Sequence, residues 1–283
     1  VAVAGEHRIT GDARIPAFPT ADDARISLRV AGDDFRFVQK LLQRPATIPA
    51  AYVASIEVTG TSDNREQIAG SIHIGKIVAE LSGLVGDHPG YAQSDLRLQL
   101  SGPDAESVGE LLALPLPKAP FEGEGHVSID REGKVRIEAL ELALAAVTLQ
   151  AEGSLRGPPH YDELDLDIRA HSDSLARSST LFGLKPLGDV PGSLKATVGG
   201  SLEAVRISGI NADAGDLQLR QRAGTLSYGD GELRSDLGFA VRIAELSRVL
   251  GSYADPRLTM DSLSFELAAL ADADRISLQL TEL

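Results

Sequence analysis

Hydrophobic and polar residues alternate with a period of two along most of this chain. Ile26, Leu28 and Val30 alternate with charged or hydroxyl residues, and the segments around Leu98 and Leu166 repeat the pattern. Such alternation is typical of β-strands with one apolar and one solvated face. Turn residues separate the alternating segments at intervals of about 8 to 12 residues. The pattern therefore predicts on the order of 20 antiparallel strands, connected mainly as a meander.

Short amphipathic segments interrupt the strands at four places. They cover residues 33–42, 104–114, 173–184 and 244–253. Asp34, Asp104 and Asp173 are the expected N-caps of the first three, because a carboxylate there accepts hydrogen bonds from free helix amides. Helices this short are not stable alone, so we expect each to pack on the sheet or to cover its edge.

The order of strand, helix and further strands recurs with a spacing of about 70 residues. The copies start at Ala24, Ser94, Asp162 and Asp236. A fixed period is typical of an extended array, in which each unit buries its apolar surface against its neighbours. We therefore expect residues 1–283 to form a single continuous array, with units near 20–90, 91–160, 161–230 and 231–283. Because the period still runs at Leu283, we expect the chain to be a fragment of a longer protein.

A sheet of this size has a long aliphatic face that four short helices cannot cover. It must therefore fold into a sandwich, close as a barrel or curl into a trough. Aromatic residues make up only 4% of the chain, and many Ala and Gly residues leave room between the Leu, Ile and Val side chains. This composition favours an extended, curled sheet that forms a groove, although a GC-rich genome accounts for part of it. The residues predicted to line the groove are Ile26, Leu28, Val30, Leu96, Leu98, Leu100, Leu142, Leu149, Leu164, Leu166, Ile168, Leu217, Leu219, Leu263, Phe265, Leu278 and Leu280.

The formal net charge is −14, and the basic residues are scattered singly along the sequence. Because phosphate groups attract concentrated positive charge, this spacing disfavours nucleic-acid binding and docking on a flat anionic bilayer. No run of 18 or more apolar residues is present, so no segment is expected to span a membrane. The chain has no Cys, which excludes disulfides, zinc-thiolate sites and thiol catalysis.

No catalytic or metal-binding motif is found in the sequence. The six His residues are dispersed, and neither a G-x-S-x-G elbow nor a phosphate-binding loop is present. The carboxylates at residues 162–167 indicate a solvated strand face, with a calcium site as the alternative. The run at 211–216 resembles a calcium loop but has Arg222 where the twelfth-position Glu is required, so we interpret it as a turn. The Pro-rich run at 111–117 is interpreted as the end of a helix rather than a proline-rich ligand. We therefore predict no enzyme, no cofactor and no metal.

Two adjacent segments carry a family resemblance. Residues 96–117, LRLQLSGPDAESVGELLALPLP, and residues 121–130, FEGEGHVSID, resemble the repeat of AsmA-like proteins. In that family a strand ends in S-G-P followed by Asp or Ser, a short helix ends in L-L-G-L-x-L-P, and a strand with Y/F-x-x-x-G follows. Ala113 stands here where Gly is common. The resemblance covers residues 20–283 and is strongest in the second unit.

The AsmA-like and TamB-like families are similar to eukaryotic bridge-like lipid-transfer proteins. The resemblance implies a taco-shaped β groove in the periplasm, an inner-membrane anchor that this chain lacks, and movement of phospholipid towards the outer membrane. Inner- and outer-membrane proteins are implied as further partners.

Two main hypotheses follow from the sequence. In the first, the aliphatic face shields acyl chains while the lipid head groups stay in water, driven by burial of about 0.8 kcal/mol per CH₂ group. In the second, the sheet is a closed, dry structural or adhesive array that docks envelope proteins. An enzyme of the cell envelope is the third hypothesis, and no group of residues favours it.

Overall fold

The computed structural model of this chain is mainly β, and the paired strands are antiparallel. It describes residues 2–4, 7–14, 24–41, 48–61, 65–86, 91–112, 116–157, 162–201, 204–229, 232–243, 249, 263–272 and 275–282. The chain divides into two compact units, unit 1 (Val1–Ala145) and unit 2 (Ala146–Leu283). The prediction of a mainly β, antiparallel fold is confirmed.

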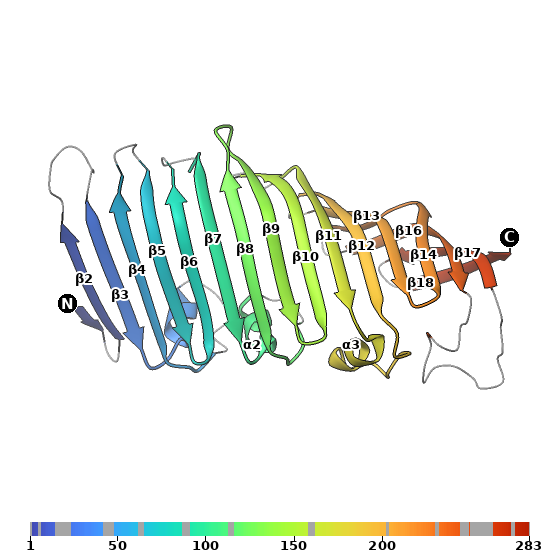
Figure 1. The fold of residues 1–283 in the computed structure, drawn as a ribbon, viewed down its shortest axis with the longest axis horizontal. Helices are drawn as coiled ribbons and strands as arrows, with labels where there is room; N and C mark the ends of the chain where they lie inside the picture. The colour runs from blue at the N-terminus through green and yellow to red at the C-terminus, as the bar shows by residue number, and fades with distance from the viewer. Residues whose placement is uncertain are drawn as a thin grey trace. The chain divides into compact units, whose positions relative to one another are not determined.

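Unit 1 is a meander in which each strand pairs with the next (Figure 1). Its elements are β1 (Ala2–Ala4), β2 (His7–Arg14), β3 (Arg25–Gly32), α1 (Arg36–Leu41), β4 (Tyr52–Gly60), β5 (Glu66–Ile74), β6 (Ile77–Val85), β7 (Ser94–Gly102), α2 (Ala105–Leu112), β8 (Phe121–Ile129) and β9 (Lys134–Leu144). Strand β9 pairs with β8 through a register shift between His126 and Val127.

Unit 2 continues the same construction. Its elements are β10 (Val147–Arg156), β11 (Leu164–Ser172), α3 (Leu175–Leu181), β12 (Gly192–Gly200), β13 (Ala204–Ala214), β14 (Leu217–Ala223), β15 (Leu226–Gly229), β16 (Glu232–Ile243), β17 (Leu263–Asp272) and β18 (Arg275–Glu282). Strands β14 and β15 share one position in the sheet, because both pair with β13 on one side and with β16 on the other. Of β17 and β18 only the backbone is described.

Two of the three predicted N-caps are confirmed. Asp34 accepts a hydrogen bond from the Arg36 amide at 3.0 Å, and Asp104 accepts one from the Glu106 amide at 3.1 Å. In α3 the prediction is wrong by one residue, since Ser174 is the N-cap and accepts from the Arg177 amide at 3.2 Å. A Ser hydroxyl is as good a cap as an Asp carboxylate, so both positions fit the sequence pattern.

The fourth predicted helix, at residues 244–253, lies almost entirely outside the described residues. Val249 alone is described there, as helical and buried.

The helices cover the ends of the strands that precede them. Around α1, the buried residues Phe35, Ile48, Tyr52 and Ile74 form one core cluster. The side-chain oxygen of Gln39, fully buried in α1, accepts a hydrogen bond from the Ile48 amide at 3.0 Å. A buried amide group with a partner stabilises this packing, whereas an unpaired one would destabilise it. Around α1, the end of the sheet is therefore closed by packed side chains.

Two glycines allow neighbouring strands to approach unusually closely. Gly83 in β6 and Gly153 in β10 both have φ +145°. A Cβ atom at Gly83 would lie 2.0 Å from the Asp95 carbonyl oxygen, and one at Gly153 would lie 2.1 Å from the Asp165 carbonyl oxygen. No other residue type fits at these positions without a backbone shift.

Candidate functional site

The aliphatic face of unit 1 is built from residues directly opposite one another on neighbouring strands. Opposite residues of an antiparallel pair point to the same side of the sheet. The register therefore joins one residue from each of eight strands into a middle row, and every member is apolar. From β2 to β9 this row is Gly11, Leu28, Ile56, Gly70, Leu81, Leu98, Gly125 and Leu140.

Two further apolar rows flank the middle row. One is Ala13, Ile26, Val58, Ile68, Gly83, Leu96, Val127 and Ile137, and the other is Ile9, Val30, Ala54, Ile72, Ala79, Leu100, Gly123 and Leu142. Seven strand spacings give each row a length of about 34 Å, and the outer rows lie about 14 Å apart. We call these three rows the aliphatic face of unit 1.

Four of the five large side chains of the middle row are exposed to solvent, and the fifth, Leu81, is half-buried. The exposed fraction is 40% for Leu28, 40% for Ile56, 43% for Leu98 and 42% for Leu140. Isolated exposed apolar residues are ordinary, but a contiguous exposed patch marks a binding surface or an aggregation hazard. Here four of them lie in one row, which makes this face the candidate site.

The aliphatic face ends in polar or packed residues along both edges. On the helix side, the ring of His7 stacks on Phe37 with a centroid distance of 4.1 Å, and its Nδ1 atom lies 3.3 Å from the Tyr52 hydroxyl. Burial raises the pKa of the Tyr52 hydroxyl above its ordinary value. On the opposite edge, Glu66 lies across from Gly60 and Val85. The apolar surface is therefore bounded on both sides.

Seven predicted groove residues come together on the aliphatic face of unit 1: Ile26, Leu28, Val30, Leu96, Leu98, Leu100 and Leu142. The prediction missed other members, notably Ile9, Ile56, Leu81 and Leu140. Alternation in β4 and β6 was the available signal, but Ala and Gly at several inward positions weaken it in the sequence.

In unit 2 the predicted residues share one face but differ in exposure. Leu149, Leu166 and Ile168 are half-buried, while Leu164 is only 8% exposed and belongs to a packed interior. Leu217 and Leu219 pack against a buried cluster formed by Leu237, Phe239, Val241 and Ile243 of β16. The register pairs Phe265 with Val241 and Leu263 with Ile243. The side chains of Leu263, Phe265, Leu278 and Leu280 lie outside the described residues.

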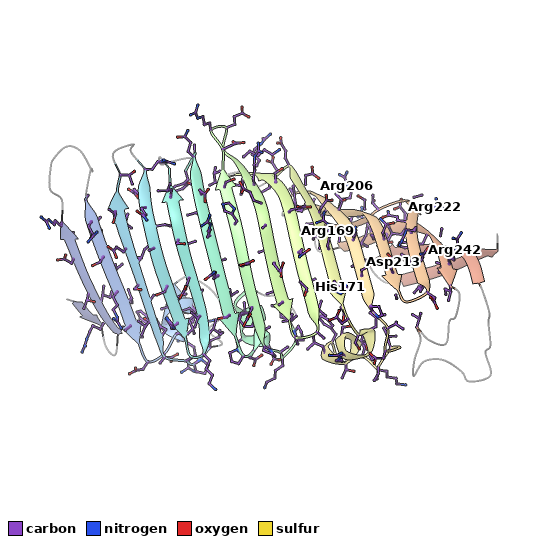
Figure 2. All side chains as sticks on the ribbon, viewed as in Figure 1. Arg169, His171, Arg206, Asp213, Arg222 and Arg242 are labelled. Atoms are coloured by element: carbon purple, nitrogen blue, oxygen red, sulfur yellow. The ribbon has the colours of Figure 1, made fainter. Side chains whose placement is uncertain are left out.

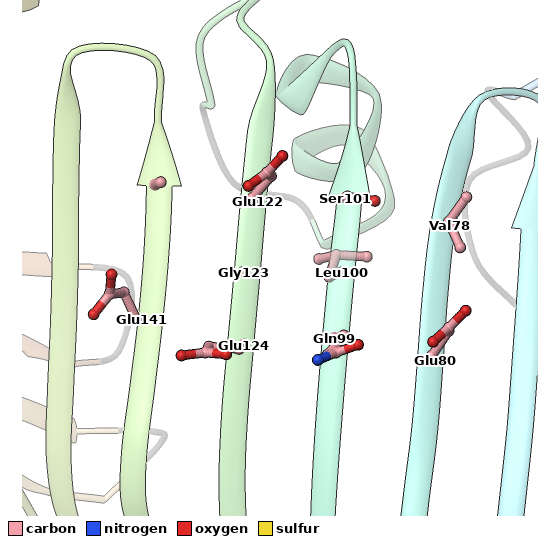
Figure 3. A pocket seen from close by; sticks show the side chains of 10 residues that line it. Val78, Glu80, Gln99, Leu100, Ser101, Glu122, Gly123, Glu124 and Glu141 are labelled. Carbon is pink, nitrogen blue, oxygen red and sulfur yellow. The ribbon is translucent and has the colours of Figure 1, made fainter.

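The opposite face of unit 1 is polar and carries a hollow of about 420 Å³ between β6 and β9. Glu80, Gln99, Glu124 and Glu141 form one row across it (Figure 3). Glu124 and Glu141 lie directly opposite each other, an arrangement that destabilises a sheet when both are charged. In the described part of the chain, no three His, Asp or Glu side chains are placed to hold a metal ion. A second hollow, of about 620 Å³, lies on the same face beside Arg29 and Ser55.

His126 is the most highly connected of the His side chains described. Its Nε2 atom lies 3.0 Å from an Asp95 oxygen, and its Nδ1 atom lies 3.0 Å from a Glu138 oxygen. Ser128 donates to Glu138 at 2.9 Å. The group links three neighbouring strands through their polar face, a cross-strand network that orders the sheet.

The run at 211–216 ends β13 and continues into the turn at Gly215, which has φ +56°. Residues 211–214 are therefore strand, and the interpretation as a turn is correct only for Gly215 and Asp216. In the run at 111–117, Leu111 and Leu112 end α2, Pro117 lies beyond the helix, and Pro115 lies outside the described residues.

No protein-family model, curated protein or solved structure matches this chain. Among the helices of the described residues, none has the length and apolar character needed to cross a membrane.

Proposed function

We propose that this chain binds the acyl chains of phospholipids on its aliphatic face and conducts them along the sheet. The observation that carries the proposal is the exposed middle row of unit 1, which crosses eight strands without a polar side chain. A surface of this kind gains free energy by losing contact with water, and acyl chains are a flexible apolar partner that fits it.

The dimensions of the face support an acyl ligand. A hydrocarbon core about 30 Å thick gives a single leaflet chain a length of about 15 Å. The rows run for about 34 Å, so one chain occupies less than half of a row. Each methylene that loses about half of its water contact contributes about 0.4 kcal/mol. His7 and Glu66 lie at the two edges of the aliphatic face, where a lipid head group can stay in contact with water.

The wider setting of this function rests on the resemblance of residues 96–130 to AsmA-like proteins. Within this proposal the chain is part of a longer periplasmic protein anchored to the inner membrane, with repeated units that curl into a taco-shaped groove. Phospholipid then moves between the inner and outer membranes. The order strand, helix, strands around α1, α2 and α3 supports a repeat of this kind.

A closed structural or adhesive array is the second candidate function, and one observation favours it. Leu237, Phe239, Val241 and Ile243 are each between 5% and 8% exposed, as expected of a dry interior. The cluster lies on β16, and the residues packed against it lie on β13, β14 and β15, whereas the middle row of unit 1 is exposed. The two candidate functions therefore predict opposite properties of unit 1: an aliphatic face open to a lipid, or one that is covered and dry.

Native mass spectrometry of the whole purified chain, with lipid extraction alongside, separates them. The acyl-binding proposal expects phospholipid or detergent bound in near-stoichiometric amounts. A mass equal to the protein alone, with no uptake of an added fluorescent phospholipid, would overturn that proposal and favour the closed array.

A further inference from the structure

A cationic patch lies on the polar face of unit 2, although the chain as a whole is acidic. We define it by Lys195 on β12, Arg206 on β13, Arg222 on β14 and Arg242 on β16, all of which are exposed. Figure 2 shows the three arginines on neighbouring strands. They are separated by 16 and 20 residues in the sequence, which is why no cluster is visible there.

The register places these residues together. Lys195 lies across from Asn211, which in turn lies across from Arg220. Arg242 lies across from Gln218, and Arg206 lies across from Ser227. Arg222 occupies the bulge at the end of β14, where the pairing with β16 shifts. Arg242 is level with Ser193 of β12 and Arg206 with Gly199, so the four cations lie within about 15 Å across the strands and about 20 Å along them.

The described carboxylates on the patch strands have partners of their own. Of the described carboxylates on β12 to β16, Asp213 is paired with Arg220 at 2.6 Å, and Asp236 accepts a hydrogen bond from the Thr225 amide at 2.6 Å. Lys195 and the three arginines of the patch have no ion-pair or hydrogen-bond partner for their side chains within the described residues.

On the strands next to the patch, β10 and β11, two acidic side chains have partners of their own. Glu152 is paired with Arg169 at 2.5 Å, and Asp167 accepts from the Thr197 hydroxyl at 3.0 Å. Asp165 lies across from Gly199, the neighbour of Arg206 in the next strand. It is the nearest carboxylate by register that has no hydrogen-bond or ion-pair partner within the described residues. At about 0.15 M salt the Debye length is about 8 Å, so more distant carboxylates are screened from the patch.

We propose that the cationic patch docks unit 2 on the surface of a bilayer that contains anionic phospholipids. Phosphate-bearing head groups complement four exposed cations on one strand surface, and each such Lys or Arg strengthens binding to an anionic bilayer. A bilayer is favoured over nucleic acid, because the described side chains of the patch strands offer no aromatic residue on this face for stacking on bases. Docking does not depend on acyl binding, since the patch lies on the face opposite the aliphatic residues.

The test is sedimentation of the whole chain with phosphatidylcholine vesicles, with and without phosphatidylglycerol. Wild type is expected to bind only the phosphatidylglycerol vesicles, and to bind them less as salt increases. The triple variant Arg206→Gln, Arg222→Gln, Arg242→Gln removes three cations and is expected to bind on the order of 100-fold more weakly, at about fivefold per arginine.

The matched control removes three exposed cations from unit 1 instead: Arg8→Gln, Arg29→Gln and Arg97→Gln. It has the same net charge as the triple variant and is expected to bind like wild type. Equal weakening in both triple variants would overturn the proposal, as would equal binding to both kinds of vesicle or to neither.

One further outcome identifies a different occupant. If wild type associates with itself at low salt, binds no vesicle, and loses self-association in the patch variant, the partner is the acidic hollow of a second copy and the bilayer proposal is wrong. Uptake of a fluorescent phospholipid from detergent, measured on the same variants, reports acyl binding separately. Loss of vesicle binding with intact uptake thus distinguishes the two proposals.

Discussion

Replacing Leu98 by Asp places a carboxylate in the middle row, between Leu81 on β6 and Gly125 on β8. Leu98 is 43% exposed, so the folded state gains only about half of the 1.5–3 kcal/mol that full burial of a Leu provides. We expect the variant to lose about 1–2 kcal/mol of unfolding free energy and to remain folded. Its effect on the binding of an acyl chain should be of similar size.

Because the new carboxylate stays hydrated, an acyl chain that crosses the middle row cannot pack over it. If about three methylenes lose their contact with the protein at about 0.4 kcal/mol each, the loss is about 1.2 kcal/mol, or about eightfold in affinity. The measurement is fluorescent phospholipid binding, together with extraction of co-purifying lipid. Leu166→Asp makes the same change in unit 2, between Gly153 and Val198, and is expected to act in the same direction.

The matched control is Gln99→Asp, one residue further along the same strand and on the opposite face. It introduces the same charge across from Glu80 and Glu124, which costs about 0.2–1 kcal/mol in stability. It should leave lipid binding unchanged. Wild-type lipid binding by a folded Leu98→Asp protein would refute the assignment of the aliphatic face as the acyl site, as would equal losses in both variants.

Three further predictions concern the sheet itself. Gly83→Ala should destabilise the protein by about 1–3 kcal/mol in urea unfolding, because the new Cβ meets a carbonyl oxygen of β7 at 2.0 Å, whereas Gly11→Ala, with its nearest contact at 3.4 Å, should have little effect. Glu124→Lys should raise the unfolding free energy by about 0.2–1 kcal/mol, and more at low salt, because it replaces repulsion of Glu141 by attraction; an unchanged or lower value contradicts this. The raised pKa of Tyr52 means that the folded state holds its proton to higher pH than the unfolded state, so this contribution to stability is present below pH 10.0 and is lost as the pH rises through the folded-state pKa. Tyr52→Phe should therefore show a smaller fall in the urea midpoint above pH 10.0 than wild type, and an identical fall would count against the burial of this hydroxyl.

Local patterns were sufficient to predict the strands and the first three helices. Alternation depends on the period-two geometry of a strand, and capping depends on a few adjacent residues, so both can be read from short segments. The error at α3 has the same local origin, since Asp173 and Ser174 are adjacent and both are good caps. The interruption between β14 and β15 was not predicted, because Gly224 and Thr225 look like any turn in the sequence.

Exposure could not be predicted from the pattern. Leu28 and Val241 lie in equally regular alternating segments, yet Leu28 is 40% exposed and Val241 is 5% exposed. The difference depends on what packs over the strand, which is a property of distant segments. The cationic patch was missed for a related reason, because Arg206, Arg222 and Arg242 become neighbours only through the register of three strands.

The glycines of the middle row recur at every third strand: Gly11 on β2, Gly70 on β5 and Gly125 on β8. Three strand spacings amount to about 14 Å, so the surface met by a ligand moving across the strands is corrugated with that period. A shift of one period restores equivalent contacts, and the ligand then crosses a series of similar small barriers instead of escaping from one deep minimum. The mobility of an acyl chain on this face is therefore set by the activation energy of a single step, and it can remain high even where the total affinity is large.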